Sequence, residues 1–203
     1  MFTGLVETTG KILRAGAVLQ VESVVDLGLE PGDSLCVSGS CLTVTTTVGR
    51  SITFDVSPET FRRIKPPLKG ETVNLERSLK WEGRLHGHFV TGHVDCVGVV
   101  KRVVRFSGFS EITIGYPTEH APLLVEKGSV AVSGISLTVC ALTDSDFVVA
   151  LIPETLEHTS AGGWKPGTKV NLEFDIIGKY VVRAAAGTRI EGSLRKYLEN
   201  HEY

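Results

Sequence analysis

The sequence predicts an all-β protein made of two tandem copies of one unit, followed by a helix. Three observations lead to this class. A set of motifs occurs twice in the same order, each copy is a series of short apolar runs separated by turn residues, and the apolar spacing becomes helical after about Val182. We therefore expect one unit over residues 1–87, a second over 88–183 and a helical segment over 184–203.

The duplication is clearest in a nine-residue motif. Val37-Ser-Gly-Ser-Cys-Leu-Thr-Val-Thr45 returns as Val132-Ser-Gly-Ile-Ser-Leu-Thr-Val-Cys140, with six of the nine positions identical. Three further pairs keep the same order: Thr3-Gly4 with Thr91-Gly92, Pro58-Glu-Thr60 with Pro153-Glu-Thr155, and Gly70 to Glu76 with Gly167 to Glu173. The offset grows only from 88 to 97, which indicates a duplicated unit with small loop insertions.

Local patterns predict strands and one short helix in each unit. Turn signals such as Glu30-Pro-Gly-Asp33 recur about every ten residues, a spacing typical of a small barrel or sandwich. Ser57 is placed to cap a helix that begins at Pro58, whereas Ile152 stands at the equivalent position of the second unit. The second short helix should therefore start less firmly than the first.

The last predicted element is an amphipathic helix. Its apolar residues fall at the i, i+4, i+7 and i+8 positions, and they are Ile190, Leu194, Tyr197 and Leu198. A helix of this length is marginal on its own, so we expect it to dock against a neighbouring subunit.

Composition excludes several classes of function. The 203-residue chain is 42% apolar, and its net charge of −2 with scattered basic residues gives no one-sided positive surface for nucleic acid or an anionic membrane. No basic leader precedes an apolar segment, and no apolar run approaches the roughly 20 residues that span a bilayer. The four cysteines lack Cys-x-x-Cys spacing and are interpreted as reduced thiols. We expect a cytoplasmic protein that binds a small neutral or weakly acidic ligand.

The repeated strand motif is the first candidate for ligand binding. Because side chains alternate along a strand, Cys41 and Thr43 share one face in the first unit, as Ser136 and Thr138 do in the second. Polar side chains that face water explain one such strand, but the same pattern at the same place in both units favours a ligand. A glycine before each strand would let a flat ligand approach the backbone. These glycines are Gly39 and Gly134.

The Pro-Glu-Thr motif stands at the start of both short helices. The free backbone N–H groups of a helix start and the threonine hydroxyl suit the oxygens of a polyol or a pyrimidinedione. Ordinary helix initiation explains a single copy at least as well.

Three histidines lie within eight residues, at His86, His88 and His93. A metal site and a glycine-rich turn both fit this spacing, and the turn is favoured because no acidic or thiol partner completes a ligand set. His93 replaces Leu5 of the first unit directly after the repeated Thr-Gly. This replacement suggests that the two units bind their ligands differently.

Five motifs together resemble the riboflavin synthase family, and the resemblance covers nearly the whole chain. They are Met1-Phe-Thr-Gly-Leu-Val-Glu7, Gly39-Ser-Cys-Leu-Thr-Val44, Gly87-His-Phe-Val-Thr-Gly-His-Val-Asp95, Gly134-Ile-Ser-Leu-Thr-Val139 and Leu151-Ile-Pro-Glu-Thr-Leu156. The family implies two six-stranded Greek-key β-barrels, each with a lumazine site, and a C-terminal α-helix that joins three chains into a homotrimer. It also implies an association with lumazine synthase.

The resemblance further implies which residues form the sites. The catalytic residues would be Cys41, His93, Ser136 and Thr138. The first ligand site would comprise Gly4, Leu5, Val6, Cys41, Leu42, Thr43, Asp55, Val56, Ser57, Pro58, Glu59 and Thr60. The second would comprise Gly92, His93, Val94, Ser136, Leu137, Thr138, Ala150, Leu151, Ile152, Pro153, Glu154 and Thr155. A contact supplied by the adjoining chain would come from Lys127.

The implied activity is the dismutation of two molecules of 6,7-dimethyl-8-ribityllumazine. Transfer of a four-carbon unit from one to the other gives riboflavin and 5-amino-6-ribitylamino-pyrimidinedione. A duplicated fold suits this reaction, because each half can supply one site and hold two identical rings face to face. No metal or organic cofactor is expected, since the substrate is its own electron sink. The alternative is a non-catalytic lumazine- or flavin-binding protein on the same fold, and the presence of Cys41, His93 and Ser136 favours the enzyme.

Overall fold

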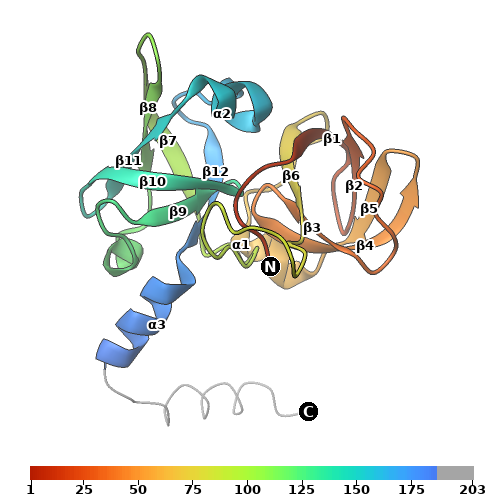
Figure 1. Ribbon diagram of the computed structural model, residues 1–203, viewed down its shortest axis with the longest axis horizontal. Coiled ribbons are helices and arrows are strands. Elements are labelled where there is room, and N and C mark those ends of the chain that lie inside the picture. The colour runs from red at the N-terminus through yellow and green to blue at the C-terminus, as the bar shows by residue number, and fades with distance from the viewer. Residues whose placement is uncertain (187–203) are drawn as a thin grey trace.

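The computed structural model describes residues 1–186 and contains two closed antiparallel β-barrels side by side (Figure 1). The first barrel consists of β1 (Thr8–Arg14), β2 (Val18–Ser23), β3 (Ser34–Val37), β4 (Ser40–Val48), β5 (Ser51–Asp55) and β6 (Thr72–Arg77). The second consists of β7 (Cys96–Arg105), β8 (Ser110–Gly115), β9 (Ser129–Val132), β10 (Ile135–Leu142), β11 (Asp146–Leu151) and β12 (Lys169–Phe174). The circular order is β1-β2-β5-β4-β3-β6 in one and β7-β8-β11-β10-β9-β12 in the other, so the predicted pair of six-stranded Greek-key barrels is confirmed.

Alternating side chains fill each barrel and bulges bend its strands. Along β4, Leu42 is buried inside the barrel, Cys41 is half-buried and Thr43 is exposed, as the strand motif predicts. The strand pairing shifts after Val44 in β4 and at the equivalent place in β10, after Val139. Such bulges let a strand bend sharply enough for a small barrel to close.

The two short helices, α1 (Pro58–Arg63) and α2 (Pro153–His158), differ in their first turn as predicted. Ser57 Oγ accepts a hydrogen bond from the backbone N of Thr60 at 3.1 Å, whereas the Ile152 side chain offers no cap to α2. The second unit also contains two 3₁₀ helices, η1 (Thr118–Leu123) and η2 (Ser160–Gly163).

The last described helix, α3 (Ile176–Ala185), projects away from the second barrel (Figure 1). Asp175 caps it by accepting a hydrogen bond from the backbone N of Ile177 at 2.9 Å. The helix therefore begins before residue 183, where we expected the second unit to end. The predicted apolar stripe lies outside the described residues, at Ile190, Leu194, Tyr197 and Leu198. No helix within residues 1–186 is long and apolar enough to cross a membrane.

The two barrels meet through equivalent turns. Gly39, between β3 and β4, faces Gly134, between β9 and β10, and a Cβ on Gly39 would lie 3.0 Å from the backbone N of Gly134. Both glycines have positive φ angles, +89° and +81°. The expectation that they admit a flat ligand is therefore wrong, because the backbone of the opposite barrel fills the space beside each of them.

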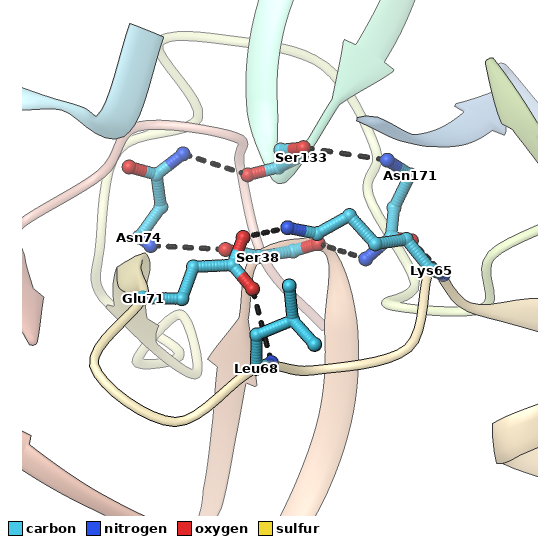
Figure 2. A network of polar contacts seen from close by, with 7 residues as sticks. All are labelled: Ser38, Lys65, Leu68, Glu71, Asn74, Ser133 and Asn171. Atoms are coloured by element: carbon cyan, nitrogen blue, oxygen red, sulfur yellow. Dashed lines mark hydrogen bonds and ion pairs between the residues drawn. The ribbon is translucent and has the colours of Figure 1, made fainter. Parts of the chain in front are cut away.

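Two asparagines tie these turns together (Figure 2). Nδ2 of Asn74 donates to the carbonyl oxygen of Ser133 at 2.9 Å, and Nδ2 of Asn171 donates to the carbonyl oxygen of Ser38 at 2.8 Å. Each Oδ1 accepts a backbone N–H of the opposite unit at 2.7 Å. The contact is a reciprocal exchange across a pseudo-twofold axis, so it fixes how the two barrels face each other.

Replacing Asn74 by alanine should lower the free energy of unfolding by about 2–4 kcal/mol, because the buried Ser133 carbonyl and the Ser160 N–H both lose their partner. Gln20→Ala is the matched control. This variant also loses an amide hydrogen bond, the one from Gln20 to Ser51 Oγ, but that bond lies within one barrel and is half-buried. We therefore expect its free energy of unfolding to fall by at most about 1 kcal/mol. Urea unfolding measures both variants, and equal losses would contradict the role given to Asn74.

Candidate functional site

A pocket of about 270 Å³ opens where the first barrel meets the segment that leads into β7. The start of β4 supplies Cys41, the first turn of α1 supplies Thr60, and the connecting segment supplies His93. These three sequence-predicted residues therefore meet in space. The residues that line the pocket are Ser40, Cys41, Glu59, Thr60, Arg63, Ile64, Gly92, His93 and Val94.

A glycine holds the connecting segment against Cys41. The backbone N of Cys41 donates to the carbonyl oxygen of Gly92 at 2.8 Å, and a Cβ on Gly92 would lie 2.5 Å from Cys41 Cβ. With a φ of +80° as well, this position requires glycine. Glu173 of β12 accepts hydrogen bonds from N and Oγ1 of Thr91 (2.6 and 2.7 Å) and from N of Gly92 (2.9 Å). Burial raises the pKa of Glu173, and these hydrogen bonds oppose the rise.

The same construction recurs beside Ser136 of the second barrel. The backbone N of Ser136 donates to the carbonyl oxygen of Gly4 at 2.8 Å, and a Cβ on Gly4 would lie 2.6 Å from Ser136 Cβ. Glu76 accepts hydrogen bonds from N and Oγ1 of Thr3 and from N of Gly4, at 2.7, 2.8 and 3.1 Å. Val6 packs against the core of the second barrel. The N-terminal segment therefore frames Ser136.

The expected grouping of these residues by sequence half is wrong. The family resemblance groups residues 4–6 with Cys41 and residues 92–94 with Ser136, but the structure exchanges the two segments. Each segment precedes its own barrel in the sequence and crosses to the other barrel in space, where its glycine carbonyl accepts the N–H of the opposite strand. Each candidate site thus combines a strand of one half with a segment of the other half.

The other site residues predicted from the sequence differ in how far their side chains are exposed to solvent. Thr43 and Thr138 are exposed on the outward faces that also carry Cys41 and Ser136. Lys127 is exposed in the turn before β9, with a φ of +65°. Besides Val94 at the pocket, four apolar candidates are buried, so that only their backbone groups can face a ligand: Leu42, Val56, Leu137 and Leu151. The candidates exposed around the two helix starts are Asp55, Ser57, Pro58, Ala150, Ile152, Pro153 and Glu154, and Thr155 is half-buried.

Sequence reasoning missed the end of α1, where Arg63 and the C-cap residue Ile64 line the pocket. Arg63 Nε lies 3.2 Å from Glu59 Oε1, and the i, i+4 spacing of this pair is the signal that could have placed Arg63 beside the site. Both side chains are 60% exposed, so the pair contributes little to stability.

The comparisons with known proteins agree with the duplicated architecture. Residues 3–78 and 91–175 each match the model of the lumazine binding domain. Curated riboflavin synthases of Bacillus subtilis and Mycobacterium tuberculosis are each 39% identical to this chain, over 191 and 198 residues. Each match covers 90% of this chain, and it covers 89% of the first relative and 97% of the second. The chain belongs to the riboflavin synthase family.

Solved structures of another protein, LumP, share the fold of this chain. LumP complexed with riboflavin superposes with a TM-score of 0.75, covering 86% of this chain and 99% of that chain. LumP complexed with 6,7-dimethyl-8-(1'-D-ribityl) lumazine gives 0.72, covering 85% and 98%. Both are 22% identical to this chain, so they show the two-barrel fold alone. The sequence relatives confirm the prediction that this protein is an enzyme, a riboflavin synthase of the transferase class.

The three neighbouring histidines of this family member do not meet. His86 is exposed, His93 lines the Cys41 pocket, and buried His88 places Nδ1 2.7 Å from Ser136 Oγ. Across residues 1–186, no three His, Cys, Asp or Glu side chains are gathered as metal ligands. Sequence reasoning does not single out His88, because its contact with Ser136 depends on where the connecting segment lies in space.

The protein should lose stability as the pH falls below about 6.5, and His88 should account for part of the loss. Burial lowers the pKa of His88 from the ordinary 6.5, while Asp175 opposes the shift. The unfolded chain then binds a proton that the folded chain does not yet bind, so acid favours unfolding in this window. Urea unfolding at about pH 7.5 and about pH 5.5 should give a smaller pH-dependent loss for His88→Asn than for the wild type. An identical loss would contradict a neutral buried His88.

Proposed function

We propose that this protein converts two molecules of 6,7-dimethyl-8-ribityllumazine into riboflavin and 5-amino-6-ribitylamino-pyrimidinedione. The observation that carries the proposal is the pair of equivalent sites with unequal side chains. One presents the thiol of Cys41 beside His93, and the other presents the hydroxyl of Ser136 on the same strand face as Thr138. Two identical substrates with opposite roles require this combination of similar shape and different chemistry.

Orientation is the first contribution of the two sites. Holding two weakly reactive rings face to face turns their encounter into an effectively intramolecular step. Gly92 and Gly4 contribute to this orientation. Each glycine lets its backbone segment approach a strand closely, so that backbone forms one side of each site. The Thr60 hydroxyl at the pocket supplies a partner for the oxygens of the pyrimidinedione or the ribityl chain.

Proton transfer and addition are the second contribution. The C7 methyl group of lumazine is acidic because its carbanion delocalises into the ring, and the His93 imidazole at the pocket is placed to accept that proton. Cys41 Sγ, or a water molecule, then adds at C7 of the second lumazine, whose conjugated ring takes up the electron pair, and it is expelled again before the products form. Ser136 and Thr138 orient the lumazine that has lost its methyl proton. The substrate acts as its own electron sink, so the proposed reaction uses no metal and no organic cofactor.

We further propose that the active form is a homotrimer, with Lys127 of one chain reaching the ligand of the adjoining chain. Exposed apolar side chains on α3 support an interface, since Ile177, Tyr180 and Val181 are 58%, 72% and 61% exposed. A cytoplasmic location suits the four cysteines, which are all unpaired. We also propose an association with lumazine synthase, which would let the lumazine pass directly from that enzyme to this protein.

A second candidate function is lumazine or flavin binding without conversion, since LumP, which shares the two-barrel fold, is described in complexes with the lumazine and with riboflavin. Incubation of the protein with the lumazine distinguishes the two functions. An enzyme produces riboflavin absorbance that grows well beyond one equivalent of protein. Ligand that stays bound and unconverted would contradict the proposed synthase activity.

A further inference from the structure

The second site contains a buried imidazole that the reaction described above does not use. His88 is 8% exposed, and its Nδ1 lies 2.7 Å from Oγ of Ser136. In the first site a thiol, Cys41, takes the place of the Ser136 hydroxyl. The paired imidazole and hydroxyl thus distinguish two sites that the repeat otherwise makes alike.

The backbone around His88 holds the ring in place. The backbone N of His88 donates to the carbonyl oxygen of Thr3 at 3.1 Å, so the N-terminal segment that frames Ser136 also anchors His88. A Cβ on Gly87 would lie 3.1 Å from Ser136 Oγ, which shows how closely the chain passes over the serine. The imidazole is therefore positioned by two segments that are distant in sequence.

The surroundings of the ring indicate where its proton lies. Burial lowers the pKa of His88, so the ring is neutral near neutral pH and carries one proton. Nε2 is buried and has no hydrogen-bond partner in residues 1–186. An unpaired buried acceptor is tolerated better than an unpaired buried N–H. The proton therefore belongs on Nδ1, from which it is donated to Ser136 Oγ.

We propose that His88 is a positioning residue that commits the Ser136 hydroxyl to donating its proton to the lumazine bound at the second barrel. With an oxygen lone pair occupied by His88 Nδ1–H, the serine O–H turns away from the ring and toward the ligand. The proposal rests on the synthase function given above. Its chemical purpose follows from the substrate: a lumazine that loses a proton from its C7 methyl group gains negative charge on its ring nitrogens and carbonyl oxygens, and a fixed O–H donor stabilises that charge.

Two isosteric replacements separate positioning from packing. Asparagine can place its Nδ2 donor near the position of the histidine Nδ1, whereas leucine has the same shape without a donor. We expect His88→Asn to keep kcat within about threefold of the wild type, and His88→Leu to lower kcat roughly tenfold with KM little changed, because the donor acts mainly on the charged transition state.

Repeating both replacements in Ser136→Ala chains makes the test specific to the contact between His88 and Ser136. In Ser136→Ala chains the difference between asparagine and leucine at position 88 should disappear, since the group that His88 positions is gone. Equal kcat losses for His88→Asn and His88→Leu, or a leucine effect that persists in full in Ser136→Ala, would overturn the proposal.

A measurement on the wild type remains informative if the leucine variant does not fold or if the protein binds lumazine without converting it. The ¹⁵N spectrum of the histidine-labelled, ligand-free protein reports which ring nitrogen carries the proton, and His88→Asn identifies the His88 signals by their absence. We expect the Nδ1–H tautomer at neutral pH. An Nε2–H tautomer or a charged ring would overturn the assignment of His88, whereas missing turnover in the wild type would overturn the synthase function instead.

Discussion

Mixed trimers of Cys41→Ala and Ser136→Ala chains should recover activity that neither variant has alone. If the catalytic site forms between the first barrel of one chain and the second barrel of its neighbour, some interfaces of a mixed trimer join an intact Cys41 to an intact Ser136. Random mixing in a ring of three gives such a pairing at about a quarter of the interfaces, so up to about a quarter of wild-type activity should return.

The control for this experiment is a chain that carries both substitutions. Mixed with Ser136→Ala chains, it leaves no intact second site anywhere, so no activity should return. Both mixtures are unfolded together, refolded and checked by mass spectrometry for mixed trimers. If mixed trimers form and their activity stays at the level of the single variants, the catalytic site lies within one chain.

A fragment of residues 1–87 should fold, pair with a second copy of itself and bind lumazine. The pseudo-twofold axis explains why. Gly4 packs against Ser136 in the same way that Gly92 packs against Cys41. In a pair of fragments, Gly4 of one copy can therefore pack against Cys41 of the other. Glu76 would continue to hold Thr3 and Gly4 within each copy. Without a partner, buried Phe2 would be exposed to water.

Glycine variants of this fragment provide a matched test. Gly4→Ala should weaken the dimer at least tenfold, about 1.4 kcal/mol, because the new Cβ would collide with the strand of the other copy. Gly32→Ala is the control, since Gly32 also has a positive φ, +98°, but nothing lies within 4 Å of a Cβ there. Sedimentation measures both dimers, and lumazine fluorescence measures binding. A monomeric fragment that binds ligand fully would contradict the crossed arrangement.

The sequence predicts the architecture well because the architecture follows from local and repeated patterns. Alternation along the strand motif places Leu42 inside the barrel and Cys41 outside it, and the repeat transfers this pattern to the second barrel. The Ser57 cap and its replacement by Ile152 are equally local, and the structure confirms both. Such features depend on neighbours within a few residues.

Contacts across the pseudo-twofold axis could not be predicted in the same way. A repeat shows that residues 3–6 and 91–94 are equivalent, but it does not show which barrel each segment meets. Gly39 carries the same signal, a close approach, whether the approaching group is a ligand or the backbone of Gly134. His88 acquires its contact with Ser136 only through this crossing.

A structure of the protein with a bound lumazine analogue tests the account of the sites most directly. The account predicts one analogue in the first-barrel pocket, in contact with Cys41, Thr60 and His93 of one chain. It predicts a second analogue at Ser136 and Thr138, framed by residues 4–6 of that same chain, and facing the first-barrel ligand of a neighbouring chain. An analogue at Cys41 that contacts residues 4–6 of its own chain, or two analogues face to face within one chain, would contradict it.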